Sequence, residues 1–192
     1  MPALAEIAVA AEGRLAVVEG DALAIDAATI GEAPRRIVAN LPYNIATPLL
    51  FAWLAHLRDF ESLTLMFQKE VAERITARPS TKAYGRLAVM TQWVGEAKKL
   101  FDIPPQAFTP PPKVTSSVVR IVARPAPDGD ADPKTMERLV ATAFNQRRKM
   151  LRQALKPLGN AEGLLAKAGI DPTRRAETLS VSEFAALARE IQ

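Results

Sequence analysis

Two patterns of hydrophobic and polar residues alternate along the first part of the chain. Short apolar runs predict buried strands, and apolar residues at helical spacing between these runs predict helices. The predicted strands cover 14–19, 36–40 and 63–67. The predicted helices run from Pro2 to about Gly13, from Thr47-Pro48 onward, and over 70–77. This alternation predicts an α/β fold with a parallel sheet that helices cover on both faces.

The pattern changes after Tyr84-Gly85, where a helix is expected to run to about Val94. Two further strands are predicted over 98–103 and 116–123, joined by the proline-rich turn 104–112. Strands this close in sequence, with no helix between them, are expected to pair antiparallel.

The stretch 123–134 is rich in Pro, Asp and Gly and marks a domain boundary. Beyond it, Asp132-Pro133 opens a helix, and Ser180 with Glu183 forms a capping-box signature before another one. We therefore predict an α/β domain over 1–125 and a small all-helical domain over 132–192.

Composition excludes several classes of chemistry. The 192 residues contain no cysteine and one histidine, His56, so thiolate nucleophiles, disulfides and a histidine-rich metal site lack material. His56 lies in an apolar stretch and is expected to be a partly buried helix residue. No apolar run is long enough to span a bilayer, and the net charge of +4 points only weakly to a polyanionic partner.

The turn Asn40-Leu41-Pro42-Tyr43 follows a predicted strand. Ligands of open parallel sheets bind beyond the carboxyl ends of the strands. The amine of adenine is a weak nucleophile, and the Asn40 side-chain oxygen and the Leu41 carbonyl could accept its two hydrogens. Tyr43 could stack on a base extruded from its strand. The alternative is a turn that only ends a strand, with Tyr43 packed in the core.

Three further segments carry candidate chemistry. In Phe108-Thr-Pro-Pro-Pro-Lys-Val114, followed by two serines, Phe108 could close the other face of the base and Lys113 could meet a phosphate. The carboxylate of Glu19-Gly-Asp-Ala22 could accept a hydrogen bond from a cofactor adenine. Arg147, Arg148, Lys149 and Arg152 lack acidic neighbours and form a candidate phosphate-binding surface. The alternatives are a rigid hairpin connection for the first segment, an ordinary turn for the second and a solvated basic face for the third.

Taken together, these segments resemble the bacterial small-subunit rRNA adenine dimethyltransferases, the kasugamycin-resistance enzymes. The resemblance is carried by the order and spacing of five stretches: Val18–Leu23, Asn40–Pro48, Lys82–Leu87, Phe108–Val114 and Ala143–Lys149. It implies a Rossmann-like class I methyltransferase domain, followed by a small all-α domain. It also implies a cytoplasmic, monomeric, metal-free enzyme that uses S-adenosylmethionine to dimethylate N6 of two adjacent adenosines near the 3′ end of 16S rRNA in the 30S subunit.

The resemblance also implies residue roles. Asn40, Leu41, Pro42 and Tyr43 would hold the target amine, with Phe108 as the stacking lid. Asp21, Ala22 and Asn40 would touch the cofactor. Lys113, Arg147, Arg148, Lys149 and Arg152 would contact rRNA.

In one respect the chain departs from the family. The family begins with a strand, a Gly-rich turn that cradles the cofactor and a second strand that ends in an acid, and no stretch here matches them. We therefore expect an N-terminally truncated member that binds the cofactor weakly. The competing hypotheses are a non-catalytic rRNA-binding assembly factor and an adenine-N6 DNA methyltransferase. The basic segment and the triple proline favour RNA over DNA.

Overall fold

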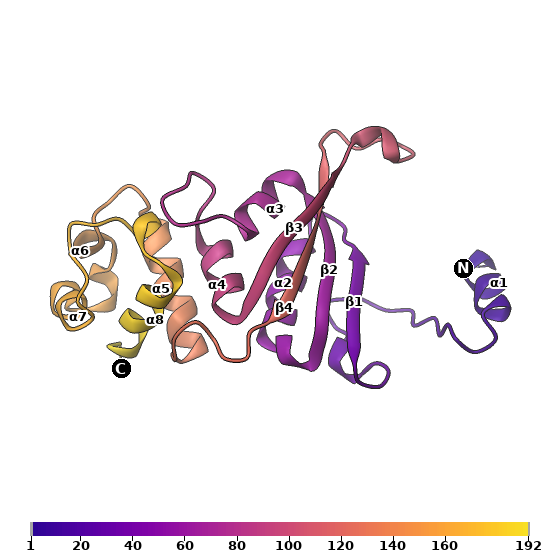
Figure 1. Ribbon diagram of the computed structural model, residues 1–192, viewed down its shortest axis with the longest axis horizontal. Coiled ribbons are helices and arrows are strands. Elements are labelled where there is room, and N and C mark those ends of the chain that lie inside the picture. Colours follow the sequence, from indigo (N-terminus) through magenta and orange to yellow (C-terminus); the bar gives the residue numbers. More distant parts are fainter. Residues whose placement is uncertain (1, 192) are drawn as a thin grey trace.

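A four-stranded sheet lies at the centre of the computed structural model, which describes residues 2–191 (Figure 1). Its strand order is β1-β2-β4-β3, with β1 and β2 parallel and the other pairs antiparallel. The strands are β1 (Arg35–Asn40), β2 (Phe60–Gln68), β3 (Gly95–Ile103) and β4 (Ser116–Ala123). The predicted strands at 36–40, 63–67, 98–103 and 116–123 are confirmed, as is the antiparallel pairing of the last two.

Three helices cover one face of this sheet: α2 (Ala46–Ala55), α3 (Lys69–Ile75) and α4 (Arg86–Val94). Their apolar side chains share one core with Leu63, Leu65 and Phe67 of β2. On the opposite face Val38 is 78 % exposed. The expectation that helices cover both faces is therefore wrong for the described residues, because α1 (Pro2–Ala10) lies apart from the sheet (Figure 1).

The strand predicted at 14–19 is also wrong. Residues 14–19 contain no strand, and Leu15, Val17 and Val18 are exposed. A strand needs a neighbour for its backbone hydrogen bonds. The described part of the chain offers one free edge beside this segment, that of β1, and residues 14–19 do not pair with it.

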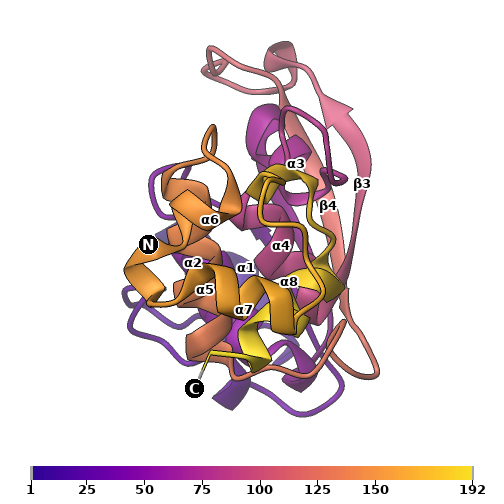
Figure 2. The ribbon, with the colours of Figure 1, turned by 90° about the vertical axis from the view of Figure 1, so that its left-hand side faces the viewer.

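The carboxy-terminal helices pack around a second core (Figure 2). They are α5 (Pro133–Asn145), α6 (Leu151–Ala154), α7 (Ala161–Lys167) and α8 (Val181–Arg189). Asp132 caps α5 and the Ser180–Glu183 capping box opens α8, as the sequence predicts. Ala88, Val89 and Trp93 of α4 join the same core, so this helix contributes to both cores. The division into domains 1–125 and 132–192 stays a prediction.

Two local expectations are corrected. The N-cap of α2 is Ile45, and Thr47 lies inside the helix. The helix begins earlier than predicted because the Ile45 N–H already bonds to the Pro42 carbonyl in the turn after β1. His56 follows the end of α2 and is exposed, so it is not a partly buried helix residue. Of the helices within 2–191, none has the length and apolar character needed to cross a membrane.

Candidate functional site

The turn after β1 buries one residue and exposes its neighbours. Asn40 ends the strand and is exposed, whereas the Leu41 side chain is 6 % exposed and joins the core beneath the sheet. The backbone N–H of Ile45 donates to the carbonyl of Pro42 at 3.1 Å, and α2 begins at the next residue. Leu41 thus anchors the turn while Asn40, Pro42 and Tyr43 face solvent at the strand end.

Tyr43 is 38 % exposed, and its hydroxyl lies 2.8 Å from the Ser116 hydroxyl in a hydrogen bond. Ser116 is the first residue of β4 and is fully buried. This contact joins the Asn40–Tyr43 turn to the end of the proline-rich connection.

The loop that carries Phe108 lies at the same edge of the sheet as this turn. β1 is parallel to β2, and β3 is also parallel to β2 because both pair antiparallel with β4. The carboxyl ends of β1, β2 and β3 therefore lie at the same end of the sheet. The loop 104–115 leaves β3 at that edge and extends beyond the sheet at the top of Figure 1. Phe108 is half-buried, and its N–H donates to the Pro105 carbonyl at 3.1 Å, while Lys113 is exposed. Both loops follow the carboxyl ends of parallel strands, and the Phe108 and Tyr43 rings do not form an aromatic pair among the described residues.

Sequence reasoning missed an ionic cluster at the root of this loop. Asp102 lies 2.9 Å from Lys69 Nζ and 3.0 Å from Lys99 Nζ, and it accepts a hydrogen bond from Ser117 at 2.7 Å. These donors, Lys69 first, hold the pKa of Asp102 far below its usual range. The cluster fastens the start of β4 to β3 and α3. Its members lie far apart in the sequence, so no local sequence motif predicts the cluster.

The predicted cofactor contacts are not assembled. Asp21 and Ala22 are exposed, and the Asp21 carboxylate accepts a hydrogen bond from the nearby Leu23 N–H at 2.9 Å. No hydrogen bond joins either residue to Asn40 among the described residues. A carboxylate that caps its own turn in solvent does not form a cavity for an adenosyl group. Asp21, Ala22 and Asn40, as they lie in this structure, therefore do not form a binding site that fits S-adenosylmethionine.

The basic segment Arg147–Lys149 lies in the turn between α5 and α6. The helix ends at Asn145 because the apolar face that packs it stops there. Arg148, Lys149 and Arg152 are exposed, as expected of phosphate contacts. Arg147 is half-buried, and its guanidinium donates to Glu177 at 2.6 Å and to the Thr81 carbonyl at 3.3 Å.

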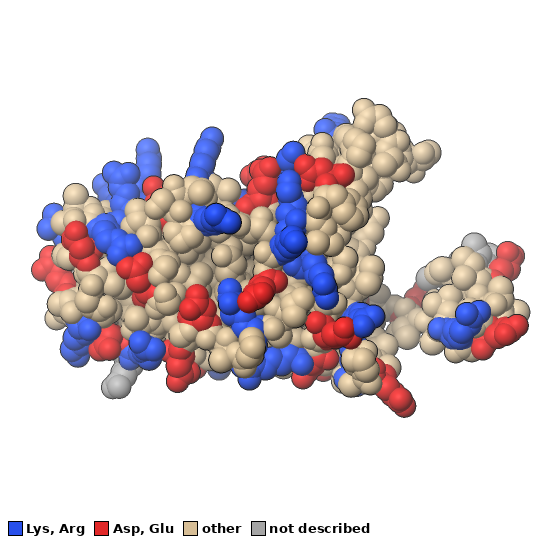
Figure 3. Space-filling view, in the orientation of Figure 1, with Lys and Arg blue, Asp and Glu red and all other residues tan. Residues whose placement is uncertain are grey.

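The fold adds cations that the linear sequence does not group with this turn. The Ser80 N–H donates to the Glu177 carbonyl at 2.7 Å, which holds the loop with exposed Arg78 and Lys82 beside Arg147. Arg175 forms an isolated antiparallel β-bridge with Met150, which places it next to this turn. Lys and Arg side chains accordingly project along the upper edge of the helical part in Figure 3. We call this set the basic cluster: Arg78, Lys82, Arg147, Arg148, Lys149, Arg152 and Arg175.

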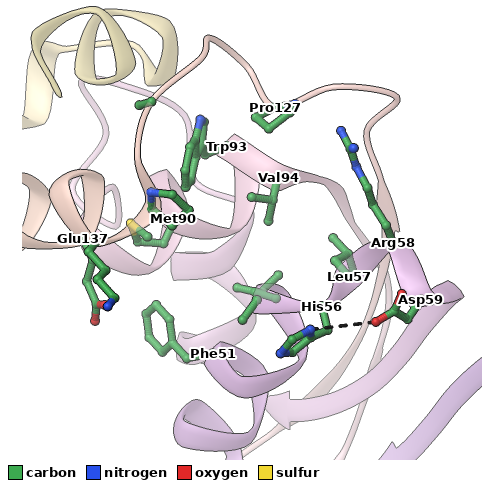
Figure 4. A pocket seen from close by; sticks show the side chains of 15 residues that line it. Phe51, His56, Leu57, Arg58, Asp59, Met90, Trp93, Val94, Pro127 and Glu137 are labelled. Atoms are coloured by element: carbon green, nitrogen blue, oxygen red, sulfur yellow. Dashed lines mark ion pairs between the residues drawn. The ribbon is translucent and has the colours of Figure 1, made fainter. Parts of the chain in front are cut away.

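A cavity of about 500 Å³ lies elsewhere, between α2, α4 and the segment that leads into α5 (Figure 4). Phe51, Met90 and Trp93 line it, and His56 and Asp59 lie 3.8 Å apart at its rim. These rim residues precede β2, so the cavity lies toward the opposite edge of the sheet from the Asn40–Tyr43 turn. It shares no residue with the candidate site.

Comparison with known proteins assigns a relationship to this architecture. The family model described as ribosomal RNA adenine dimethylase matches residues 2–192. "Ribosomal RNA small subunit methyltransferase A" of Rhodospirillum rubrum is 63 % identical over 98 % of this chain and 65 % of its own length. The protein of the same name from Roseobacter denitrificans is 57 % identical over 100 % of this chain and 70 % of its own length. The chain thus spans about two thirds of the length of these relatives.

Solved structures resemble the fold at lower identity. A dimethyladenosine transferase from Plasmodium falciparum superposes with a TM-score of 0.78 at 24 % identity, over 96 % of this chain and 75 % of that one. The 23S rRNA methyltransferase ErmE gives a TM-score of 0.67 at 22 % identity, over 100 % of this chain and 79 % of that one. At these identities the likeness concerns the fold alone.

Proposed function

Since the chain belongs to the ribosomal RNA adenine dimethylase family, with its class I methyltransferase fold, we propose that it carries the target-base and RNA-binding parts of a small-subunit rRNA adenine dimethyltransferase. The proposed reaction transfers methyl groups from S-adenosylmethionine to N6 of two adjacent adenosines near the 3′ end of 16S rRNA. The substrate is a nearly mature 30S particle.

The observation that carries this proposal is the turn after β1, where buried Leu41 holds Asn40 and Tyr43 outward at the strand end. The exocyclic nitrogen of adenine shares its lone pair with the ring and becomes nucleophilic as it turns tetrahedral. The Asn40 side-chain oxygen and the Leu41 carbonyl accept its two hydrogens in that state. Pro42 has no N–H to compete and restricts Leu41 to an extended conformation.

Two aromatic residues capture the base in this proposal. Tyr43 offers one face of a stack and Phe108, on the loop at the same edge, offers the other. Neither ring discriminates between bases, because stacking tolerates any base. The acceptors at Asn40 and Leu41 therefore select an amine-bearing base.

The basic cluster, together with Lys113 on the β3–β4 loop, binds the phosphates of the rRNA. Its exposed guanidinium and ammonium groups carry no base-reading geometry of their own, so they position the particle without reading its sequence. Arg147 supports this surface from beneath, because its guanidinium is bonded to Glu177 and Thr81.

A non-catalytic role is the second candidate, and the exposed, unassembled Asp21 and Ala22 favour it. In that case the chain binds the small subunit through the basic cluster and holds an adenine without methylating it. The family relationship covers both candidates, and they differ in whether the chain by itself transfers methyl groups.

Methyl transfer to 30S particles, measured with labelled S-adenosylmethionine, tests the proposal. The assay compares the chain with a chimera that carries, upstream, the strand, Gly-rich turn and second strand with which the family begins, taken from the Rhodospirillum rubrum relative. We expect turnover in the chimera and loss of most of it in the Asn40→Ala chimera, with 30S binding retained, since the missing interaction belongs to the transition state. Near-normal turnover after Asn40→Ala would contradict the assignment of the site. Turnover in the unextended chain would exclude the non-catalytic candidate.

A further inference from the structure

Ser116 is the buried hydroxyl that faces the candidate site. It is fully buried, and Ser62, Thr91 and Ser117 are the other buried polar side chains among the described residues. Of these hydroxyls, that of Ser116 is bonded to a residue of the target turn, the Tyr43 hydroxyl at 2.8 Å. The two residues are 73 positions apart in the sequence, so the bond is a product of the fold.

We propose that Ser116 is a positioning residue that fixes the Tyr43 ring in the orientation in which an extruded adenine stacks on it. This inference rests on the proposed function of the turn. It adds a residue and a role to that site, and it connects the turn to the loop that carries Phe108.

The energetics of burial favour this bond over its alternatives. A buried hydroxyl without a partner costs free energy, and no other partner for the Ser116 hydroxyl is observed among the described residues. Tyr43, by contrast, is 38 % exposed and could reach water instead. Because the buried Ser116 hydroxyl needs a hydrogen-bond partner, it favours the orientation in which the Tyr43 hydroxyl reaches it. The Tyr43 ring is then held at one end by the backbone of the turn and at the other by its hydroxyl.

The serine is itself held rigidly. Ser116 lies between Gln68 of β2 and Ile103 of β3 in the sheet. The preceding carbonyl, of Thr115, accepts the Lys69 N–H at 2.9 Å. The following residue, Ser117, donates to Asp102 of the ionic cluster at 2.7 Å. A support fixed on both sides transmits little motion to the tyrosine ring.

The bond also connects Tyr43 to the root of the loop that carries Phe108. The loop that carries Phe108 ends at Thr115, next to Ser116. Tyr43 is therefore tied to the root of the loop that closes over the base. Holding the Tyr43 ring before the base arrives lowers the ordering cost of capture.

Fluorine NMR gives a test that needs no activity. The chain has two tyrosines, so incorporation of 3-fluorotyrosine yields two signals. Tyr84 is the internal control, because it is fully buried and its hydroxyl donates to the Leu179 carbonyl at 2.9 Å. In Ser116→Ala the Tyr43 signal is expected to move toward that of a water-exposed tyrosine, with the Tyr84 signal unchanged. Ser116→Thr keeps a hydroxyl and should restore the signal, and Ser62→Ala, a buried serine of the same sheet, should leave it in place.

Binding of a short RNA with 2-aminopurine at the target position supplies the second readout. This base lacks the 6-amino group, so its fluorescence reports stacking rather than the Asn40 contact. Ser116→Ala should weaken binding about three- to tenfold, the reduction expected for one net hydrogen bond. In a Tyr43→Phe background it should have no further effect, because the partner hydroxyl is gone.

The outcomes separate the two levels of the argument. An unmoved Tyr43 signal in Ser116→Ala, or unchanged RNA binding in that variant while Tyr43→Ala weakens it, overturns the positioning role and leaves the proposed function standing. If Tyr43→Ala itself leaves binding unchanged, the stacking function of the turn fails, and the positioning role fails with it.

Discussion

At the scale of single residues, the candidate site depends on one buried side chain in an exposed turn. Leu41 packs into the core, and its neighbours on both sides are thereby presented to solvent. The alternative interpretation of this turn, with Tyr43 packed in the core, conflicts with its 38 % exposure.

Tyr43→Ala and Phe108→Ala should each weaken capture of the base. Base–aromatic stacking is worth roughly 1–3 kcal/mol per base, so the affinity of each variant for the 2-aminopurine RNA should fall about 5- to 150-fold. The Phe101→Ala variant is a matched control, since Phe101 is 55 % exposed on the open face of the sheet and belongs to neither loop. Equal reductions in all three variants would show that the measurement reports general stability.

At the scale of elements, the first turn of α8 makes a pH-dependent contribution to stability. Glu183 accepts hydrogen bonds from the Arg174 guanidinium and from the Ser180 N–H of the capping box. These contacts, Arg174 first, lower the pKa of Glu183 below its usual value. A lowered folded-state pKa means that the stabilisation is present above the unfolded pKa and is lost as the pH falls through the folded one.

Glu183→Gln should therefore destabilise the protein at neutral pH and flatten the fall in stability below about pH 4.5. The destabilisation at neutral pH is expected to be on the order of 1 kcal/mol, as for other cap residues. Urea unfolding followed by circular dichroism across this range measures it. Glu190→Gln, at the other end of α8, is the control and should leave the acid limb unchanged.

The basic cluster should set the salt dependence of RNA binding. Replacing Arg148 and Lys149 with Gln should reduce the slope of log Kobs against log salt by about 1 for each phosphate that is no longer bound. Arg147→Gln should change the slope less and lower stability more, because its guanidinium is bonded to Glu177 and Thr81. Lys167→Gln on α7, outside the cluster, controls for net charge. An unchanged slope in the double variant would mean that the cluster is only a solvated face.

The elements show how far the sequence alone leads. Local patterns predicted four strands and the starts of α5 and α8, because periodicity and caps are local signals. The strand at 14–19 failed since a strand depends on a partner that its own residues do not encode. The Tyr43–Ser116 bond and the approach of the loop before Lys82 to Arg147 were invisible for the same reason. Both need segments more than sixty residues apart to meet.

At the scale of the whole molecule, the sheet has a free edge at β1, and the segment that precedes this strand leads away from the sheet (Figure 1). The edge strand β1 pairs on one side only, and the exposed residues 14–24 emerge beyond it (Figure 1). An unpaired strand edge and an exposed apolar segment are both prone to non-native association. The exposed segment also contains Asp21 and Ala22. Ordering of this segment against the sheet is therefore required for the predicted cofactor contacts to assemble.

The chain should therefore bind S-adenosylmethionine very weakly or not at all, whereas the chimera carrying the additional segment of the Rhodospirillum rubrum relative should bind it and protect the β1 amides from hydrogen exchange. The physical reason is that Asp21, Ala22 and Asn40 are not held together by any observed contact, so binding must first order the chain around them. Calorimetric titration of both proteins with S-adenosylmethionine measures the difference. Asp21→Asn should weaken binding in the chimera and change nothing in the chain. Equal affinities in the two proteins would place the main cofactor contacts within these 192 residues and would refute the interpretation of Asp21 and Ala22 as unassembled.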